Sequence, residues 1–157
     1  MTEKKPDIRI SVGSLESRIQ EACLAISQKS SLVPRIGIVL GSGLSDVGEE
    51  LAQQTLIPYS DIPHFHTPSI PGHQGQLVLG RLQGTPVLLL KGRYHFYEGY
   101  SMEEVAFPTR VAAALGIQTL VLTNAAGGVN TRFRPGEVML IEDHLNLMAD
   151  NPLIEIG

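Results

Sequence analysis

The sequence lacks the cysteines that a disulfide framework or a multi-cysteine metal site needs, because Cys23 is the only cysteine among 157 residues. It also lacks an excess of basic residues: 12 Lys and Arg stand against 16 Asp and Glu, and the formal charge is −4. Nucleic-acid and anionic membrane surfaces need concentrated Lys and Arg. We therefore expect neither nucleic acid nor a membrane as a partner.

Long apolar runs are lacking as well. No stretch approaches the ~18 consecutive apolar residues typical of a membrane span. Residues 1–6 lack the apolar core of a signal peptide. These absences predict a soluble protein of a reducing compartment, and we expect a cytoplasmic location. A length near ~150 residues is typical of one domain with its own core, so residues 1–157 are expected to form a single α/β domain.

What the sequence does contain is 16 Gly and 10 Pro, placed between compact apolar runs. Apolar residues at three- and four-residue steps predict a helix that starts at Ser14 as N-cap and buries Cys23 in the core. Ser101 and Glu104 form a capping box that predicts a second helix to about residue 115. Short apolar runs predict strands at 36–40, 55–57, 76–82, 86–91, 117–123 and 138–141, with a hairpin turn at 83–85. This alternation indicates an α/β fold with a largely buried central sheet flanked by helices.

Three loops follow apolar strands, and in open α/β sheets ligands bind beyond the carboxyl ends of strands. In the first loop, Gly41 and Gly43 free the backbone so that its N–H groups and the Ser42 hydroxyl can meet a small anion. An ordinary glycine turn is the alternative. In the third loop, residues 124–128, small residues around Asn124 and Ala125 let a ligand approach the backbone. Tight packing at the strand end is the alternative there.

The second loop, residues 92–100, carries the most functional groups. Arg93 offers a planar fork of donors that suits phosphate or carboxylate. His95 can donate to an anion oxygen or move a proton, and Glu98 can orient it. Tyr97 has a flat face and a hydroxyl tip that suit a sugar or a ring. A surface loop with a chance Arg/His pair is the alternative.

Three further histidines lie between residues 60 and 75. His73 stands between two glycines and adds a possible anion donor. His64 and His66 form an H-x-H pattern, but no cysteine or carboxylate framework accompanies them, so we expect no metal. Taken together, the loops supply an arginine, two histidines, a hydroxyl and backbone amides. That collection predicts a site for phosphate or another anion with an aromatic neighbour.

These segments resemble the trimeric class of the purine nucleoside phosphorylase family. The resemblance runs from about Arg35 to Leu153, and the motifs follow in the family's order and spacing. It implies a mixed, largely buried central sheet flanked by helices, of the phosphorylase type. The matching stretches are residues 41–44 (GSGL), 72–75 (GHQG), 92–95 (GRYH), 97–100 (YEGY), 123–128 (TNAAGG), 143–146 (DHLN) and 151–153 (NPL).

The resemblance implies phosphorolysis, a pentosyl transfer in purine salvage that turns a purine (deoxy)ribonucleoside and phosphate into free base and (deoxy)ribose 1-phosphate. Phosphate is then a co-substrate, no cofactor is needed, and the complete protein is a homotrimer. The residues that would hold phosphate are Ser42, His73, Arg93, His95 and the Ala125 backbone. Tyr97 would meet the ribose, Asn124 would shape the loop beneath the sugar, and Glu98 would support His95.

The chain also departs from the family. Ser45 replaces a glycine that is common after the GSGL motif, and the family continues well beyond residue 157. The Glu and Asn that recognise the purine cannot be mapped, so base preference stays open. Two hypotheses remain. The chain is the N-terminal portion of a phosphorylase, incomplete at its C-terminus, or it is a truncated, non-catalytic fragment that binds phosphate weakly or only makes subunit contacts. In either case we expect this chain alone to show little phosphorolysis of inosine.

Overall fold

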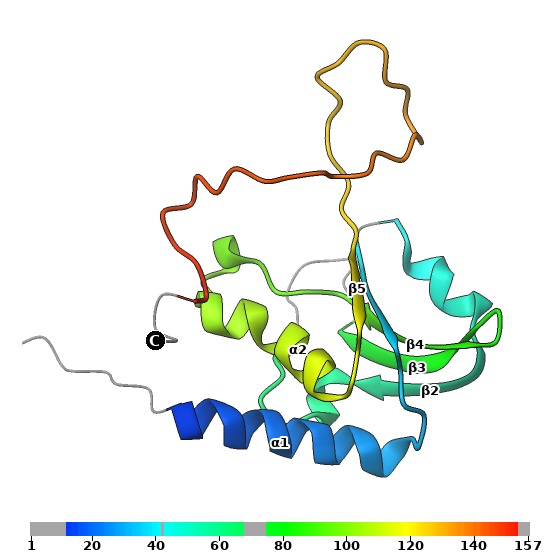
Figure 1. Ribbon diagram of the computed structural model, residues 1–157, viewed down its shortest axis with the longest axis vertical. Coiled ribbons are helices and arrows are strands. Elements are labelled where there is room, and N and C mark those ends of the chain that lie inside the picture. Colours follow the sequence, from blue (N-terminus) through cyan, green and yellow to red (C-terminus); the bar gives the residue numbers. More distant parts are fainter. Residues whose placement is uncertain (1–11, 42, 68–74, 154–157) are drawn as a thin grey trace, which may run out of the picture.

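A five-stranded mixed sheet in the order β2-β3-β4-β1-β5 forms the centre of the protein (Figure 1). The structure, a computed structural model, describes residues 12–41, 43–67 and 75–153. These described residues contain two α-helices, three short 3₁₀ helices and five strands. They are α1 (Val12–Lys29), β1 (Ile36–Leu40), η1 (Ser45–Glu50), β2 (Ala52–Pro58), η2 (Tyr59–Asp61), β3 (Gln76–Leu82), β4 (Thr85–Lys91), η3 (Phe96–Glu98), α2 (Met102–Ala114) and β5 (Thr119–Leu122).

Both directions of strand pairing occur in the sheet. β3 pairs antiparallel with β2 and with β4, and the β3–β4 pair closes through a two-residue turn at Gln83 and Gly84. Both turn residues have positive φ, 48° and 83°, as the tightest hairpin turns require. β1 instead runs parallel to β4 on one side and to β5 on the other. The predicted hairpin and the mixed sheet are thus confirmed.

Alternate residues of the central strands enter two separate cores. Leu88 and Leu90 of β4 face the core beneath the helices, together with Ala22 and Ile26 of α1 and Val111 of α2. Val87 and Leu89 face the opposite core, which packs against η1. Because both faces are covered, β4 is apolar at nearly every position and not at alternate ones.

The capping box predicted for the second helix is present. The Ser101 hydroxyl accepts from the Glu104 N–H at 3.2 Å, and the Glu104 carboxylate accepts from the Ser101 N–H at 2.7 Å. Cys23 also lies where the helical pattern places it, half-buried against the helix-side core. Burial raises the pKa of its thiol. Among the described residues, no helix combines the length and apolarity needed to cross a membrane.

Three local predictions are wrong. Ser14 is not an N-cap, because the helical backbone already begins at Val12. The strand predicted as buried at 117–123 is shorter and largely exposed, since β5 is the last strand of the sheet. Residues 138–141 form no strand, because no described strand lies beside them to share hydrogen bonds and their side chains are exposed.

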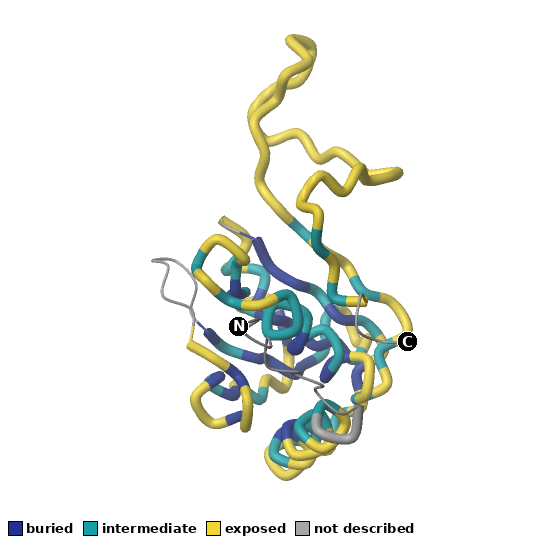
Figure 2. Tube along the Cα trace, turned by 90° about the vertical axis from the view of Figure 1, so that its left-hand side faces the viewer, coloured by how far each residue is buried: buried dark blue, intermediate teal, exposed yellow. Residues whose placement is uncertain are grey.

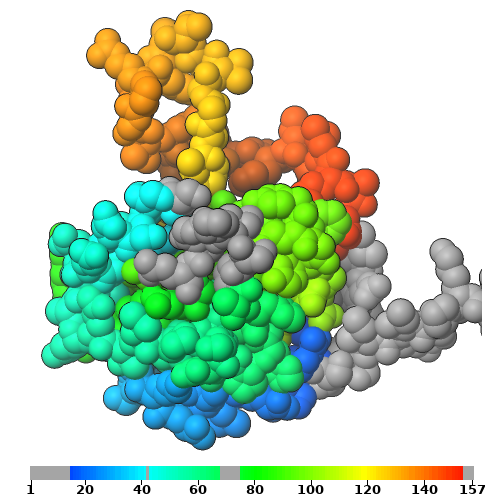
Figure 3. Space-filling view, turned by 180° about the vertical axis from the view of Figure 1, so that it is seen from behind, coloured from blue at the N-terminus to red at the C-terminus, as the bar shows by residue number. Residues whose placement is uncertain are grey.

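The chain after β5 differs from the rest of the molecule. Every residue from 124 to 149 is exposed, and residues 123–153 contain neither helix nor strand. Figure 2 shows this segment as a long exposed excursion away from the buried strands, and Figure 3 shows it projecting from the compact body. We call residues 124–153 the distal segment. It returns to the body at α2, where Arg110 Nη2 donates to the Pro152 carbonyl at 2.9 Å.

Candidate active site

Three loops leave the sheet at one edge because β4, β1 and β5 are parallel neighbours. The chain leaves β1 at Gly41, β4 at Gly92 and β5 at Thr123. The structure therefore brings together the loops that contain Arg93, His95, Asn124 and Ala125. Ser42 and His73 lie outside the described residues.

Hydrogen bonds tie these loops to one another at Thr123. The Thr123 hydroxyl accepts from the Gly41 N–H at 2.7 Å and donates to the Val39 carbonyl at 2.8 Å. The Thr123 carbonyl accepts from Arg93 Nη1 at 3.0 Å. Gly41 has to be a glycine here, since a Cβ would lie 2.8 Å from the Thr123 carbonyl oxygen. The loop after β5 is thus fixed to both other loops.

Two buried tyrosines support the start of the second loop. Gly92 turns the chain with a φ of 111°, and the Tyr59 hydroxyl donates to its carbonyl at 2.8 Å. The Tyr94 hydroxyl accepts from the His66 N–H at 2.9 Å. Burial raises the pKa of both phenols, of Tyr59 well above its usual value, so both stay protonated at neutral pH. Arg93 lies between two residues that are anchored in this way.

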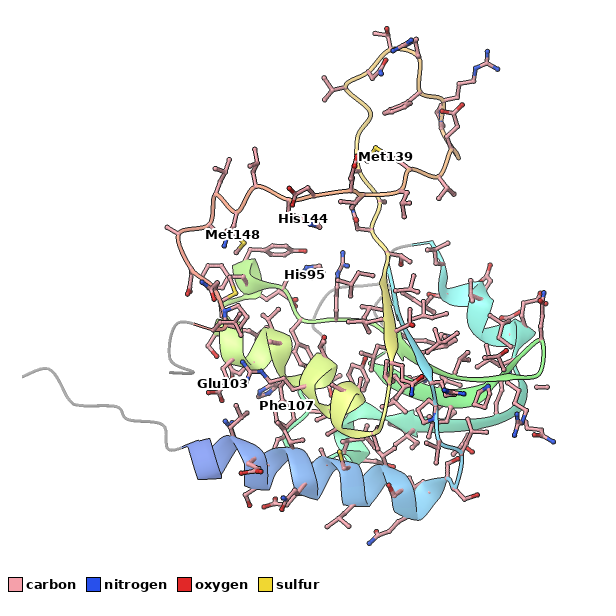
Figure 4. All side chains as sticks on the ribbon, in the orientation of Figure 1. His95, Glu103, Phe107, Met139, His144 and Met148 are labelled. Atoms are coloured by element: carbon pink, nitrogen blue, oxygen red, sulfur yellow. The ribbon has the colours of Figure 1, made fainter. Side chains whose placement is uncertain are left out.

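The chain next forms a compact turn that carries His95, Tyr97 and Glu98. The Glu98 carboxylate accepts from the His95 backbone N–H at 2.8 Å. The rings of His95 and Tyr97 stack, with centroids 4.7 Å apart and planes inclined by 14°. Tyr97 is 75% exposed, so its outer face is open to a ligand. The carboxylate of Glu98 therefore fixes the backbone of His95, whose side chain is labelled in Figure 4.

The third loop is open at its surface. Asn124 and Ala125 are exposed, and the Asn124 side-chain amide donates to the Ala125 carbonyl at 3.4 Å. Small side chains leave this backbone accessible beside the Arg93 loop.

The remaining histidines that the structure describes lie outside these three loops. His64 and His66 line a cavity of about 210 Å³ between α1 and α2, with Arg18, Glu103, Glu104 and Phe107. His64 pairs with Glu21 at 2.8 Å and His66 with Glu104 at 3.2 Å. The hydrogen bond from His64 lowers the pKa of Glu21. Within the described residues, no group of three or more His, Cys, Asp or Glu has the arrangement of a metal site. His144 lies on the distal segment (Figure 4), where its N–H donates to the Asp143 carboxylate at 2.7 Å.

Comparison with known proteins identifies the family. A family model described as "Phosphorylase superfamily" matches residues 35–157, which include all three loops. The chain belongs to the phosphorylase superfamily. Purine nucleoside phosphorylase 1 of Bacillus subtilis is 51% identical over 140 residues, which are 89% of this chain and 52% of that protein. The purine nucleoside phosphorylase of Bos taurus is 46% identical over 123 residues, which are 76% of this chain and 43% of that protein.

Solved structures of the superfamily have the same fold. The purine nucleoside phosphorylase from Schistosoma mansoni in complex with acetate matches with a TM-score of 0.70 at 41% identity, over 75% of this chain and 43% of that one. Isoform 2 from the same organism, in complex with cytosine and ribose-1-phosphate, matches with a TM-score of 0.71 over 77% of this chain and 42% of that one. These matches confirm the predicted fold class. The chain spans about half the length of the curated relatives it matches.

The sequence alone predicts no role for Thr123 or Tyr59, although both hold loops of the candidate site in place. Thr123 reaches Val39 and Gly41 across more than 80 positions of sequence. The only local signal is a hydroxyl residue between an apolar strand and a run of small residues. The sequence around Tyr59 contains no motif that would indicate its contact with Gly92.

Proposed function

We propose that this chain carries the phosphate site and part of the ribose site of a purine nucleoside phosphorylase. The observation that carries the proposal is the convergence of three hydrogen-bonded loops at the ends of parallel strands, with the Arg93 guanidinium held against the Thr123 carbonyl. The named relatives support the substrate class, since they are purine nucleoside phosphorylases.

In the proposed site, phosphate is bound by Ser42, His73, Arg93, His95 and the Ala125 backbone. Phosphate attacks the anomeric carbon of the sugar while the glycosidic bond breaks. The electron pair of that bond leaves with the purine, which takes up a proton. Arg93 and the loop amides stabilise the dianion, and positioning of two reactants in one site typically supplies ~7–11 kcal/mol of barrier lowering.

The remaining residues act on the sugar. Tyr97 stacks on His95 and presents its exposed face to the ribose. Glu98 holds the His95 backbone, which sets the position from which the imidazole reaches phosphate. Asn124 shapes the loop beneath the sugar. Glu98 and Asn124 therefore help catalysis by placing other groups.

The proposal includes the setting of the reaction. The complete protein is a cytoplasmic homotrimer that acts in purine salvage on ribonucleosides and deoxyribonucleosides. Its partners are the purine nucleoside and phosphate. Inorganic phosphate is its co-substrate and no other cofactor takes part.

Titration with inorganic phosphate tests the part of the site that this chain contains. We expect the chain to bind phosphate in calorimetry and Arg93→Ala to weaken binding by about 10–100-fold, because hydrogen bonds to charged groups contribute about 1.5–3 kcal/mol. Arg81→Ala is the matched control: Arg81 donates to Gly84 at the hairpin turn, at 2.9 Å, and should leave binding unchanged. Failure of the unmodified chain to bind phosphate would contradict the proposal.

Phosphorolysis tests the whole reaction. With inosine and phosphate, the whole protein should release hypoxanthine and ribose 1-phosphate, and omission of phosphate should stop the release. Products formed equally without phosphate would indicate hydrolysis and would refute the proposed reaction.

A further inference from the structure

The hydroxyl of Thr123 both donates and accepts a hydrogen bond, and both partners lie at the end of β1 or directly after it. A hydroxyl has a single proton to donate, and Thr123 gives it to the Val39 carbonyl at 2.8 Å. Its oxygen then accepts from the Gly41 N–H at 2.7 Å. The two partners flank the last residue of β1, so the hydroxyl joins the end of β5 to the point where the first loop begins.

The backbone of the same residue contacts the second loop. The Thr123 carbonyl accepts from Arg93 Nη1 at 3.0 Å. It also lies so close to Gly41 that a Cβ there would come within 2.8 Å of its oxygen. One peptide group thus lies between the first loop and the guanidinium of Arg93.

We infer that Thr123 is a positioning residue, whose hydroxyl holds the loop after β1 and, through its carbonyl, the Arg93 guanidinium in the spacing that phosphate needs. The inference deepens the proposed function and rests on it for the identity of the anion. The hydrogen bond from the Gly41 N–H to the Thr123 hydroxyl is present without any ligand, so its effect can be measured in the ligand-free protein.

Valine is the informative replacement. It has nearly the shape of threonine and is equally suited to a strand, but it can neither accept from Gly41 nor donate to Val39. Serine keeps the hydroxyl and loses only a methyl group. Thr119→Val is the matched control, because Thr119 begins the same strand at its opposite end and is exposed.

The first measurement is amide hydrogen exchange at Gly41 in the ligand-free protein. We expect faster exchange by about tenfold in Thr123→Val, because the N–H of the buried Gly41 loses its acceptor. Exchange should return toward the original rate in Thr123→Ser and stay unchanged in Thr119→Val. Thermal unfolding of each variant checks that the fold is kept. If Thr123→Val failed to fold, Thr123→Ser would still test the inference, because the hydroxyl is retained and clearly faster exchange at Gly41 than in the unmodified protein would overturn it.

The second measurement is affinity for inorganic phosphate, with the KM for phosphate and for inosine determined separately in the whole protein. We expect Thr123→Val to weaken phosphate binding about tenfold and to raise the KM for phosphate more than the KM for inosine. Equal exchange and equal phosphate affinity in Thr123→Val and the unmodified protein would overturn the inference. If the unmodified protein bound no phosphate, the proposed function would be wrong. The exchange rates at Gly41 would then decide alone whether the Thr123 hydroxyl holds the loop after β1 in place.

Discussion

Two four-residue runs of nearly the same composition have opposite surroundings in this protein. Val87-Leu88-Leu89-Leu90 forms the middle of β4, and each of its residues is at most 2% exposed. Val138-Met139-Leu140-Ile141 lies in the distal segment, where its residues are 44–99% exposed and form no strand. Their local propensities are almost alike, so the difference comes from their neighbours.

The first run has partners on every side. β3 and β1 pair with the two edges of β4, and the two cores cover its two faces. The second run follows β5, the last strand of the described sheet, and no described strand pairs with it. Strand formation depends on packing against neighbours more than on intrinsic preference. An apolar pattern therefore predicts a strand only where the fold supplies a place for it.

The same substitution in both runs tests whether their surroundings cause the difference. Leu88→Ala should lower the free energy of unfolding by about 2–5 kcal/mol, because it leaves a cavity in the helix-side core. Leu140→Ala should change it by less than about 0.5 kcal/mol, since the side chain is 94% exposed. Urea denaturation measures both values. A large loss in Leu140→Ala would show that the distal segment is packed in solution.

A second substitution examines the boundary between the two regions. Gly41→Ala should cost about 1–3 kcal/mol in urea denaturation and should weaken phosphate binding, because the new Cβ would meet the Thr123 carbonyl. Gly127→Ala, in the distal segment, is the control, as its Cβ would find no atom within 4 Å. Equal stability of the two variants would place the close contact at Gly41 in doubt.

The parts of the fold that the sequence predicted are those with local causes. The capping box needs only Ser101 and Glu104, and the hairpin needs only a two-residue turn between apolar runs. The parallel direction of β4 and β5 also has a local cause, because α2 connects these two strands. The place of β1 between them has none, since β1 is connected to β4 through β2 and β3.

The parts that the sequence did not predict depend on distant residues. The exposure of β5 reflects its place at the end of the sheet, which no local pattern encodes. The role of Thr123 depends on Val39 and Gly41, which are remote in sequence and adjacent in space. Tyr59 meets Gly92 in the same way. Ser42 and His73 keep their predicted roles as predictions, since they lie outside the described residues.

Each of the two regions contains a side chain that accepts a hydrogen bond from a backbone N–H two or three residues further along the chain. Ser101 caps α2, whereas Asn151 accepts from the Leu153 N–H at 2.8 Å in the distal segment, where the described residues contain no helix. Ser101→Ala should cost about 1 kcal/mol in urea denaturation at neutral pH, because it removes an N-cap. Asn151→Ala should change stability by less than about 0.5 kcal/mol.

The pH dependence of this effect has a definite sign. Hydrogen bonds from the Ser101 N–H and hydroxyl lower the pKa of Glu104 below its usual 4.5. Its contribution to stability is therefore fully present above pH 4.5 and is lost as the pH falls toward the lowered value. Ser101→Ala removes the hydrogen bond from the hydroxyl to the Glu104 carboxylate and keeps the one from the Ser101 N–H, so the acid-induced loss should become smaller without vanishing. An unchanged acid profile would contradict this role of the hydroxyl.

The smallest effect is expected where the two regions meet again. Arg110 on α2 holds the end of the distal segment through the Pro152 carbonyl, at 2.9 Å. Arg110→Ala should leave the free energy of unfolding within about 0.5 kcal/mol, because a single half-exposed hydrogen bond contributes little. Amide exchange over residues 146–153 should nevertheless become faster, since this part of the chain would lose a contact that fixes it to α2. Arg132→Ala removes the same charge from an exposed part of the distal segment and should leave those amides unchanged. Equal exchange in the two variants would mean that Arg110 does not tether the segment, and that its return to α2 depends on other contacts.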